Sequence, residues 1–130
     1  MNNKGQTLVM FIIFLPVILI LVALLINYSF ISNLNLKLEN NIKSAISYGL
    51  NLKIEDANIT NDEVKDKIKF LIDENLSYES LDIKVKDNSI EVSITSKTNG
   101  FINNITNFNN TIKLNYYGNI ENQRIKIERR

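Results

Sequence analysis

The sequence predicts an α+β fold with a long N-terminal helix, a second helix and a small four-stranded antiparallel sheet. Three patterns predict it. Residues 8–26 form an uninterrupted apolar run, residues 60–75 have apolar positions three and four apart, and two later stretches alternate apolar with polar positions. A long apolar run is typical of a membrane-spanning helix, spacings of three and four are typical of an amphipathic helix, and alternation is typical of half-buried strands.

Residues 8–26, LVMFIIFLPVILILVALLI, contain no charged residue, no amide and no glycine. A helix of this length spans roughly 28 Å, close to the hydrocarbon thickness of a bilayer. Its apolar side chains favour membrane insertion by about 5 to 10 kcal/mol. The alternative is a buried helix of a soluble protein, but the rest of the chain is too small to enclose one. We therefore expect a transmembrane helix at 8–26 that continues to about residue 50 as an amphipathic helix.

The flanking segments predict the domain organisation. Residues 1–7 form a short leader, and residues 51–130 form one small α+β domain. The apolar run is longer than that of a secretory signal peptide and lacks the small-x-small ending, so we expect an anchor that signal peptidase leaves intact. Lys4 precedes the run while Lys37 and Lys43 follow it, so the charges do not decide its orientation. We expect a cytoplasmic leader and an extracytoplasmic domain, because long domains translocate largely regardless of charge.

The composition argues against several classes of function. The chain has 15 basic and 14 acidic residues, a formal net charge of +1, so no strong field attracts nucleic acid. It contains neither cysteine nor histidine, which excludes disulfides, thiolate chemistry, imidazole bases and most zinc sites. No phosphate-binding loop or dinucleotide fingerprint is present. We expect no catalytic, cofactor-binding or metal-binding residues, no small-molecule substrate, and a protein that is not an enzyme.

The beginning of the chain carries a recognisable pattern. A glycine precedes an apolar helix that bears a phenylalanine and a Leu-Pro pair, here Gly5, Phe11, Leu15 and Pro16. About the first thirty residues resemble the N-terminal segment of the TadE/TadG-like minor pilins, or pseudopilins, of Tad (Flp) pilus systems. The resemblance implies a pilin-like fold, insertion with the amino terminus in the cytoplasm, and a role in a surface filament or its assembly platform.

Two positions bear on how such a protein is processed. The resemblance implies that a prepilin peptidase cuts between Gly5 and Gln6, while the alternative is that Gly5 is an ordinary leader residue. The usual prepilin pattern has a glutamate five residues after the glycine, and this chain has Met10 there. Met10 cannot form the ion pair that this carboxylate is thought to make with a neighbouring amino terminus. A minor or platform role therefore fits better than that of a major, repeating subunit.

The long helix has two further features. Pro16 lies within the span, where it removes a backbone hydrogen bond, so we expect a kink there. Above the span, apolar residues three and four apart predict a packing face that covers the chain's own domain or neighbouring subunits; it consists of Phe30, Leu34, Leu38, Ile42, Ala45 and Ile46. Gly49 weakens a helix, so we expect the helix to end near it and residues 51–59 to form a loop.

The second helix and the strands follow. Thr60 and Glu63 predict a capping box that opens a helix ending near Asn75. Residues 81–85 and 90–94 alternate around a predicted two-residue turn of Asp87 and Asn88. A second hairpin is predicted over residues 112–127, with its turn at residues 121–122. The polar stretch 98–110 between the hairpins carries apolar residues that suit a short helical turn on the core or on the membrane surface.

These patterns lead to two hypotheses of function. The first is a minor pilin or membrane-anchored assembly component of a Tad/Flp pilus or a related secretion system. Its partners would be the lipid bilayer, other pilins or pilus-assembly membrane proteins, and a prepilin peptidase. The second is a generic single-pass adaptor of the cell envelope, anchored in the same way but unrelated to pili. Both hypotheses place the protein in the cell membrane. In both, it acts by binding other molecules and catalyses no reaction.

Overall fold

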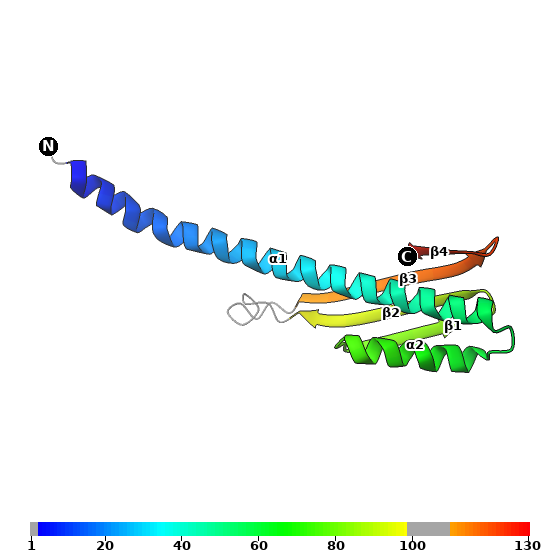
Figure 1. Cartoon of the computed structure of the whole chain (residues 1–130). Coiled ribbons are helices and arrows are strands. Elements are labelled where there is room, and N and C mark those ends of the chain that lie inside the picture. Colours follow the sequence, from blue (N-terminus) through cyan, green and yellow to red (C-terminus); the bar gives the residue numbers. More distant parts are fainter. Residues whose placement is uncertain (1–2, 99–109) are drawn as a thin grey trace.

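The computed structural model describes residues 3–98 and 110–130 and has the predicted α+β fold. A long N-terminal helix projects far beyond a small head in which a second helix and the sheet are packed (Figure 1). The elements in chain order are α1 (Asn3–Glu55), α2 (Asn61–Asn75), β1 (Ser80–Val85), β2 (Ser89–Thr98), β3 (Asn110–Glu121) and β4 (Arg124–Arg129). The helical turn predicted within residues 98–110 falls mostly outside the described residues.

The sheet is an antiparallel meander of four strands in the order β1-β2-β3-β4. Val85 pairs with Ile90, so Asp87 and Asn88 lie in the first turn as predicted. The predicted position of the second turn is wrong by one residue, because Glu121 pairs with Arg124 and leaves Asn122 and Gln123 in the turn. These two residues have φ angles of 52° and 61°. Two positive φ angles are what a type I′ turn needs, and glutamine is not a residue that signals one.

Helix α2 begins where the sequence predicts. The Glu63 amide donates to Thr60 Oγ1 over 3.2 Å, and the Thr60 amide donates to Glu63 Oε2 over 3.4 Å, so the capping box is confirmed. Val64, Ile68 and Ile72 of this helix are buried. The cap satisfies two amides at the helix end, and the apolar stripe then holds α2 against α1 and β1.

Helix α1 ends at Glu55, five residues beyond the predicted end at about residue 50. Gly49 does not end the helix, because it packs against other elements of the head. It is buried inside the helix, and a β-carbon there would lie 2.6 Å from Ile68 Cδ1 and 2.8 Å from Ile90 Cδ1. The missing side chain lets α1 approach α2 and β2 closely. Contacts with these elements hold the last turns of α1 in helical form despite the low helix propensity of glycine.

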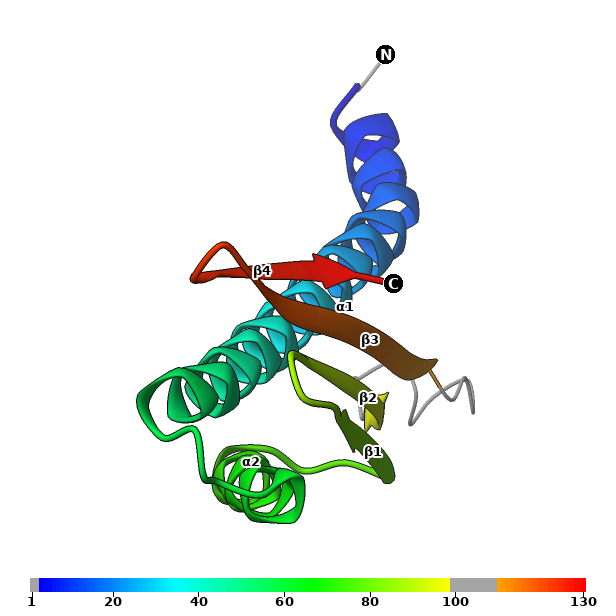
Figure 2. The same cartoon turned by 90° about the vertical axis from the view of Figure 1, so that its right-hand side faces the viewer.

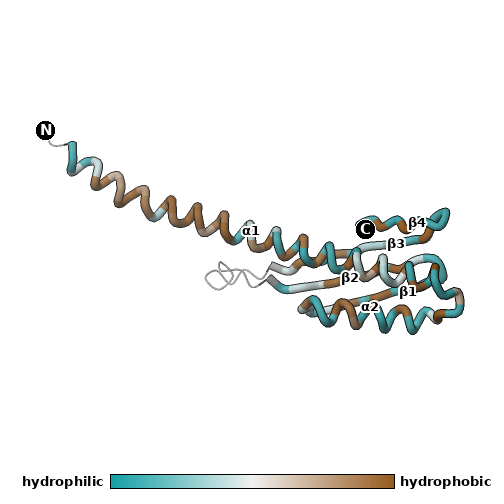
Figure 3. Tube along the Cα trace, viewed as in Figure 1, coloured by the Kyte–Doolittle hydropathy of each residue, from teal (hydrophilic) through white to brown (hydrophobic). Residues whose placement is uncertain are grey.

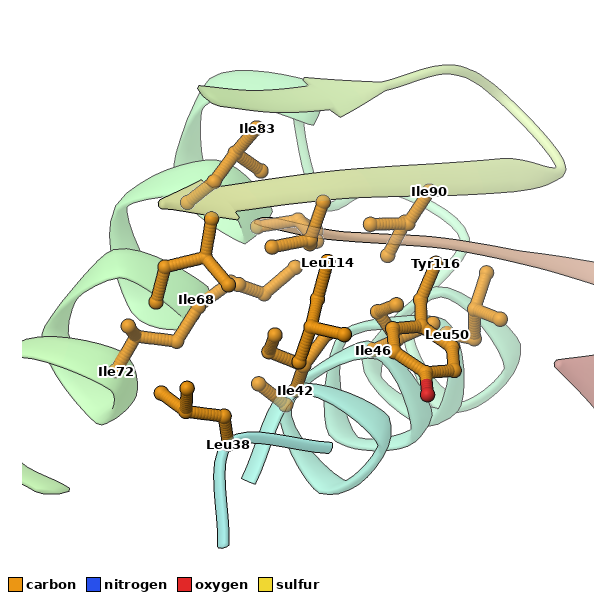
Figure 4. Close-up of a cluster of buried hydrophobic side chains, with 14 residues drawn as sticks. Leu38, Ile42, Ile46, Leu50, Ile68, Ile72, Ile83, Ile90, Leu114 and Tyr116 are labelled. Atoms are coloured by element: carbon orange, nitrogen blue, oxygen red, sulfur yellow. The ribbon is translucent and has the colours of Figure 1, made fainter. Parts of the chain in front are cut away.

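The core of the head lies between the sheet and the two helices. Helix α1 contacts β2, β3 and β4, while α2 contacts β1 and α1 (Figure 2). Figure 4 shows isoleucine and leucine side chains from both helices facing those of the strands, with Leu114 between Ile68 of α2 and the group of Ile46, Leu50 and Tyr116. The buried hydrophobic residues that form this core are Leu38, Ile42, Ala45, Ile46, Leu50, Val64, Ile68, Ile72, Ile83, Ile90, Val92, Ile94, Leu114 and Tyr116. The C-terminal half of α1 is therefore part of the head.

Candidate functional site

The most unusual surface of the molecule is the apolar segment, residues 8–26 of α1. The large hydrophobic side chains of this segment are all exposed, from 42% at Leu15 to 67% at Leu25. Figure 3 shows it as a mostly brown stretch, with one paler spot, that extends away from the head. Among the described residues, α1 is the one helix that is long and apolar enough to cross a membrane. So large an exposed apolar surface marks an interaction site for lipid or protein.

The residues of the predicted processing site lie at the very start of this helix. Gly5 and Gln6 belong to α1, which begins at Asn3, and both are exposed. A β-carbon at Gly5 would meet nothing within 4 Å, so packing within the chain does not require glycine there. Met10 is also exposed, one turn further along the helix. Cleavage at this bond stays a prediction.

Pro16 lies inside α1, and the helix is continuous across it. Proline lacks the amide that would donate to residue 12, which loosens one turn of the helix. Figure 1 shows α1 following a gentle curve along its length. The local kink at Pro16 stays a prediction.

The predicted packing face divides into two parts. Leu38, Ile42, Ala45 and Ile46 are buried in the head, and Leu34 is half-buried against the core. Phe30 is 50% exposed and lies in α1 between Leu34 and the apolar segment. The upper part of the face therefore packs on the chain's own domain, and the position of Phe30 leaves it open to the surroundings of the helix.

Lys53 connects three parts of the head, a role that no local pattern of the sequence indicates. Its ammonium group donates to Asn61 Oδ1 at the start of α2, and to the carbonyl oxygens of Lys86 and Asp87 in the β1–β2 turn, the last over 3.2 Å. Partial burial lowers the pKa of Lys53, and the Asp87 charge opposes that shift. These hydrogen bonds join the end of α1 to the start of α2 and to the β1–β2 turn, at the end of the head farthest from the apolar segment.

A second polar cluster lies where α1 crosses β3. Glu39 Oε1 and Lys43 Nζ form an ion pair at 2.8 Å, one helical turn apart. The Lys43 ammonium also lies 5.6 Å from the centre of the Tyr116 ring, a cation–π contact. The hydrogen bond from Lys43 lowers the pKa of Glu39, and burial together with the Glu39 charge raises the pKa of Tyr116. Through these contacts the cluster links α1 to β3.

A hollow of about 320 Å³ lies in the head where α1, the end of α2 and the end of β2 meet. Lys37, Asp73, Glu74 and Lys97 supply the charges around it, beside apolar side chains of Leu34 and Leu76. Lys97 is held by an ion pair with Glu79 at 2.7 Å, which raises the pKa of the lysine. Within residues 3–98 and 110–130, no group of three acidic or other metal-ligating side chains is placed to hold an ion.

The apolar segment and its junction with the head are thus the features that point to a function. No family model, curated protein or solved structure matches the chain. What the protein does must therefore be inferred from one continuous helix, which is exposed and apolar at one end and built into a folded head at the other.

Proposed function

We propose that the chain is a minor pilin or membrane-anchored assembly component of a Tad/Flp-type pilus or a related secretion system. One observation carries the proposal. A single helix of 53 residues joins the exposed apolar segment to the core of the head without a break. Because the helix is continuous, the position of its N-terminal half in the membrane determines where the head lies. The resemblance of residues 5–16 to the start of TadE/TadG-like proteins supports the same assignment.

In this proposal the apolar segment lies in the cell membrane and packs against the helices of other pilins or assembly proteins. Helices associate in lipid through close van der Waals packing and hydrogen bonds, and need no charged groups for it. The amino terminus is cytoplasmic and the head is extracytoplasmic. The head then acts by protein contact, as part of a surface filament or of the platform on which the filament grows.

Met10 bears on whether the protein would be a repeating subunit or one present in few copies. A repeating subunit would gain from a carboxylate that pairs with a neighbour's amino terminus in a medium of low dielectric constant. Methionine adds apolar contact instead, which suits a subunit present in few copies. Met10 equally favours a second candidate, an anchored adaptor of the cell envelope with no relation to pili.

The mass of the mature protein tests the proposal. The untagged chain is expressed together with a prepilin peptidase, extracted from membranes and measured intact, with a Gly5→Val variant as the cleavage control. Loss of residues 1–5 from the wild type alone supports the pilin assignment. Retention of Met1 or Asn2 in both chains supports the adaptor. A soluble monomer that needs no detergent would overturn both.

A further inference from the structure

The absence of charge in α1 extends well beyond the apolar segment. From Gln6 to Leu36 the sequence contains no charged residue, and Lys37 is the first that follows. This stretch is about 46 Å long as a helix, against about 40–45 Å for a whole bilayer with its headgroup layers. We call residues 27–36 the neck. It contains polar residues, unlike the apolar segment that precedes it, but no charged residue, unlike the head that follows it.

The neck combines exposed aromatic rings with small neutral polar side chains. Tyr28 is 74% exposed and Phe30 is 50% exposed, and Ser29 and Asn33 are exposed between and above them. Aromatic residues gather at the border between hydrocarbon and water, where a ring can lie among the headgroups. We infer that the first residues of the neck lie in the headgroup layer of the bilayer on the side of the head, with Tyr28 and Phe30 as its aromatic contacts. This inference rests on the membrane insertion of α1 in the proposed function.

The geometry favours lipid over a partner protein as the occupant of this surface. Tyr28 and Phe30 are two residues apart, so their side chains point about 200° apart around the helix. One partner helix cannot cover both rings, whereas a lipid layer surrounds the helix on every side. The exposed side chain of Leu36, at 52%, continues the uncovered surface up to the head.

The inference fixes the height of the head above the membrane. The neck is about 15 Å long, and one headgroup layer is about 5–8 Å thick. No glycine or proline interrupts it, and Leu38, the first buried residue of α1, follows directly after Lys37. The head therefore begins just outside the headgroups, with the end that carries the C-terminus of α2 turned toward the lipid surface (Figure 1).

Tryptophan fluorescence tests this placement, because the chain contains no tryptophan. Full-length Tyr28→Trp and Phe30→Trp variants are placed in phosphatidylcholine vesicles whose acyl chains carry bromine either near the carbonyls or near the chain ends. Ile18→Trp in the apolar segment and Tyr48→Trp in the head are the matched controls, since both side chains are exposed on the same helix. We expect the shallow bromine to quench both neck variants more than the deep bromine does. The opposite order is expected for Ile18→Trp, and no quenching for Tyr48→Trp.

Two results would overturn the inference, and they differ in what else they affect. If Ile18→Trp is quenched while either neck variant is not, the helix is inserted and the neck lies in water or under protein, so only this inference fails. If Ile18→Trp is not quenched either, the helix is outside the bilayer, and the inference fails together with the membrane insertion that the proposed function requires.

Discussion

Gly118 in β3 lies directly beneath Ile46 of α1, so close that a β-carbon on Gly118 would overlap Ile46 Cγ2. That β-carbon would also lie 3.1 Å from Leu50 Cδ1 and 3.4 Å from Ile127 Cγ1. Both ends of this contact are in the core, between the long helix and the middle of the sheet. The absence of a side chain at Gly118 therefore sets how closely α1 can pack on β3.

Gly118→Ala should destabilise the head by about 1–3 kcal/mol, the usual cost of overfilling a packed core. The Cγ2 atom of Ile46 is attached directly to the β-carbon, so it can move only by a χ1 rotation, which β-branching disfavours in a helix, or by a shift of the helix itself. Denaturant unfolding of the full chain in detergent, followed by circular dichroism, measures the change. Gly5→Ala is the matched control, because its new methyl group would meet nothing within 4 Å. Equal stability of both variants would show that the contact is looser than described.

Gly49→Ala should cost clearly less than Gly118→Ala, although it also adds a methyl group to the core. Its nearest atoms are the terminal Cδ1 atoms of Ile68 and Ile90, which can move by rotation of their own side chains. Alanine also favours the helix by about 1 kcal/mol relative to glycine. The two effects oppose each other, so we expect a net change within about 1 kcal/mol in the same unfolding experiment. A loss as large as that of Gly118→Ala would contradict this reasoning.

Features that depend on neighbouring residues could be predicted from the sequence, whereas contacts between distant elements could not. Spacing alone predicted both helices, the capping box at Thr60 and the first hairpin, because each depends on residues close together in the chain. The sequence predicts that the helix ends near Gly49, because the residues that pack against this glycine belong to α2 and β2 and are far from it in the chain. The turn at Asn122 and Gln123 was misplaced by one residue, since glutamine gives no signal for a positive φ.

Most of the candidate site was evident from the sequence, because hydrophobicity is a local property. The apolar run at residues 8–26 and the apolar spacing of the packing face could be predicted without knowledge of the tertiary structure. Which part of the packing face the head covers could not be predicted, since it depends on where the sheet ends along α1. The role of Lys53 was missed for the same reason, as two of its acceptors are in a turn more than thirty residues away.

Lys53→Met should destabilise the head by about 1–2 kcal/mol, because it keeps the aliphatic stem but removes three hydrogen bonds. The loss is moderate, since burial already lowers the pKa of Lys53 and water can reach the carbonyl groups of Lys86 and Asp87. Lys67→Met, at an exposed position of α2, is the control. Hydrogen exchange should speed up at residues 86–88 in Lys53→Met alone, and unchanged exchange there would argue against the connecting role.

Glu39 should make the stability of the head depend on pH in mild acid. The hydrogen bond from Lys43 holds the pKa of the Glu39 carboxyl below its ordinary value of 4.5. The unfolded chain therefore binds this proton more readily than the folded one, so the stabilisation is complete above pH 4.5 and is lost as the pH falls through the lowered pKa. Glu39→Gln should flatten the pH dependence of the unfolding free energy in this window, and an unchanged slope would show that the Glu39–Lys43 pair does not contribute to it.

Charges introduced into the apolar segment should release the protein from membranes only when two are added. One arginine at the centre of a span costs about 3 kcal/mol, and residues 8–26 favour insertion by about 5–10 kcal/mol. Ile18→Arg alone should therefore remain in the membrane pellet after alkaline carbonate extraction. The double variant Ile18→Arg with Leu21→Arg adds about 6–7 kcal/mol, comparable to the whole favourable term, and should appear largely in the supernatant. The matched pair Tyr48→Arg with Asn51→Arg places the same charges on exposed positions of the head and should stay in the pellet. Release of that control pair, or retention of the double variant in the pellet, would show that something other than the apolar segment holds the protein at the membrane.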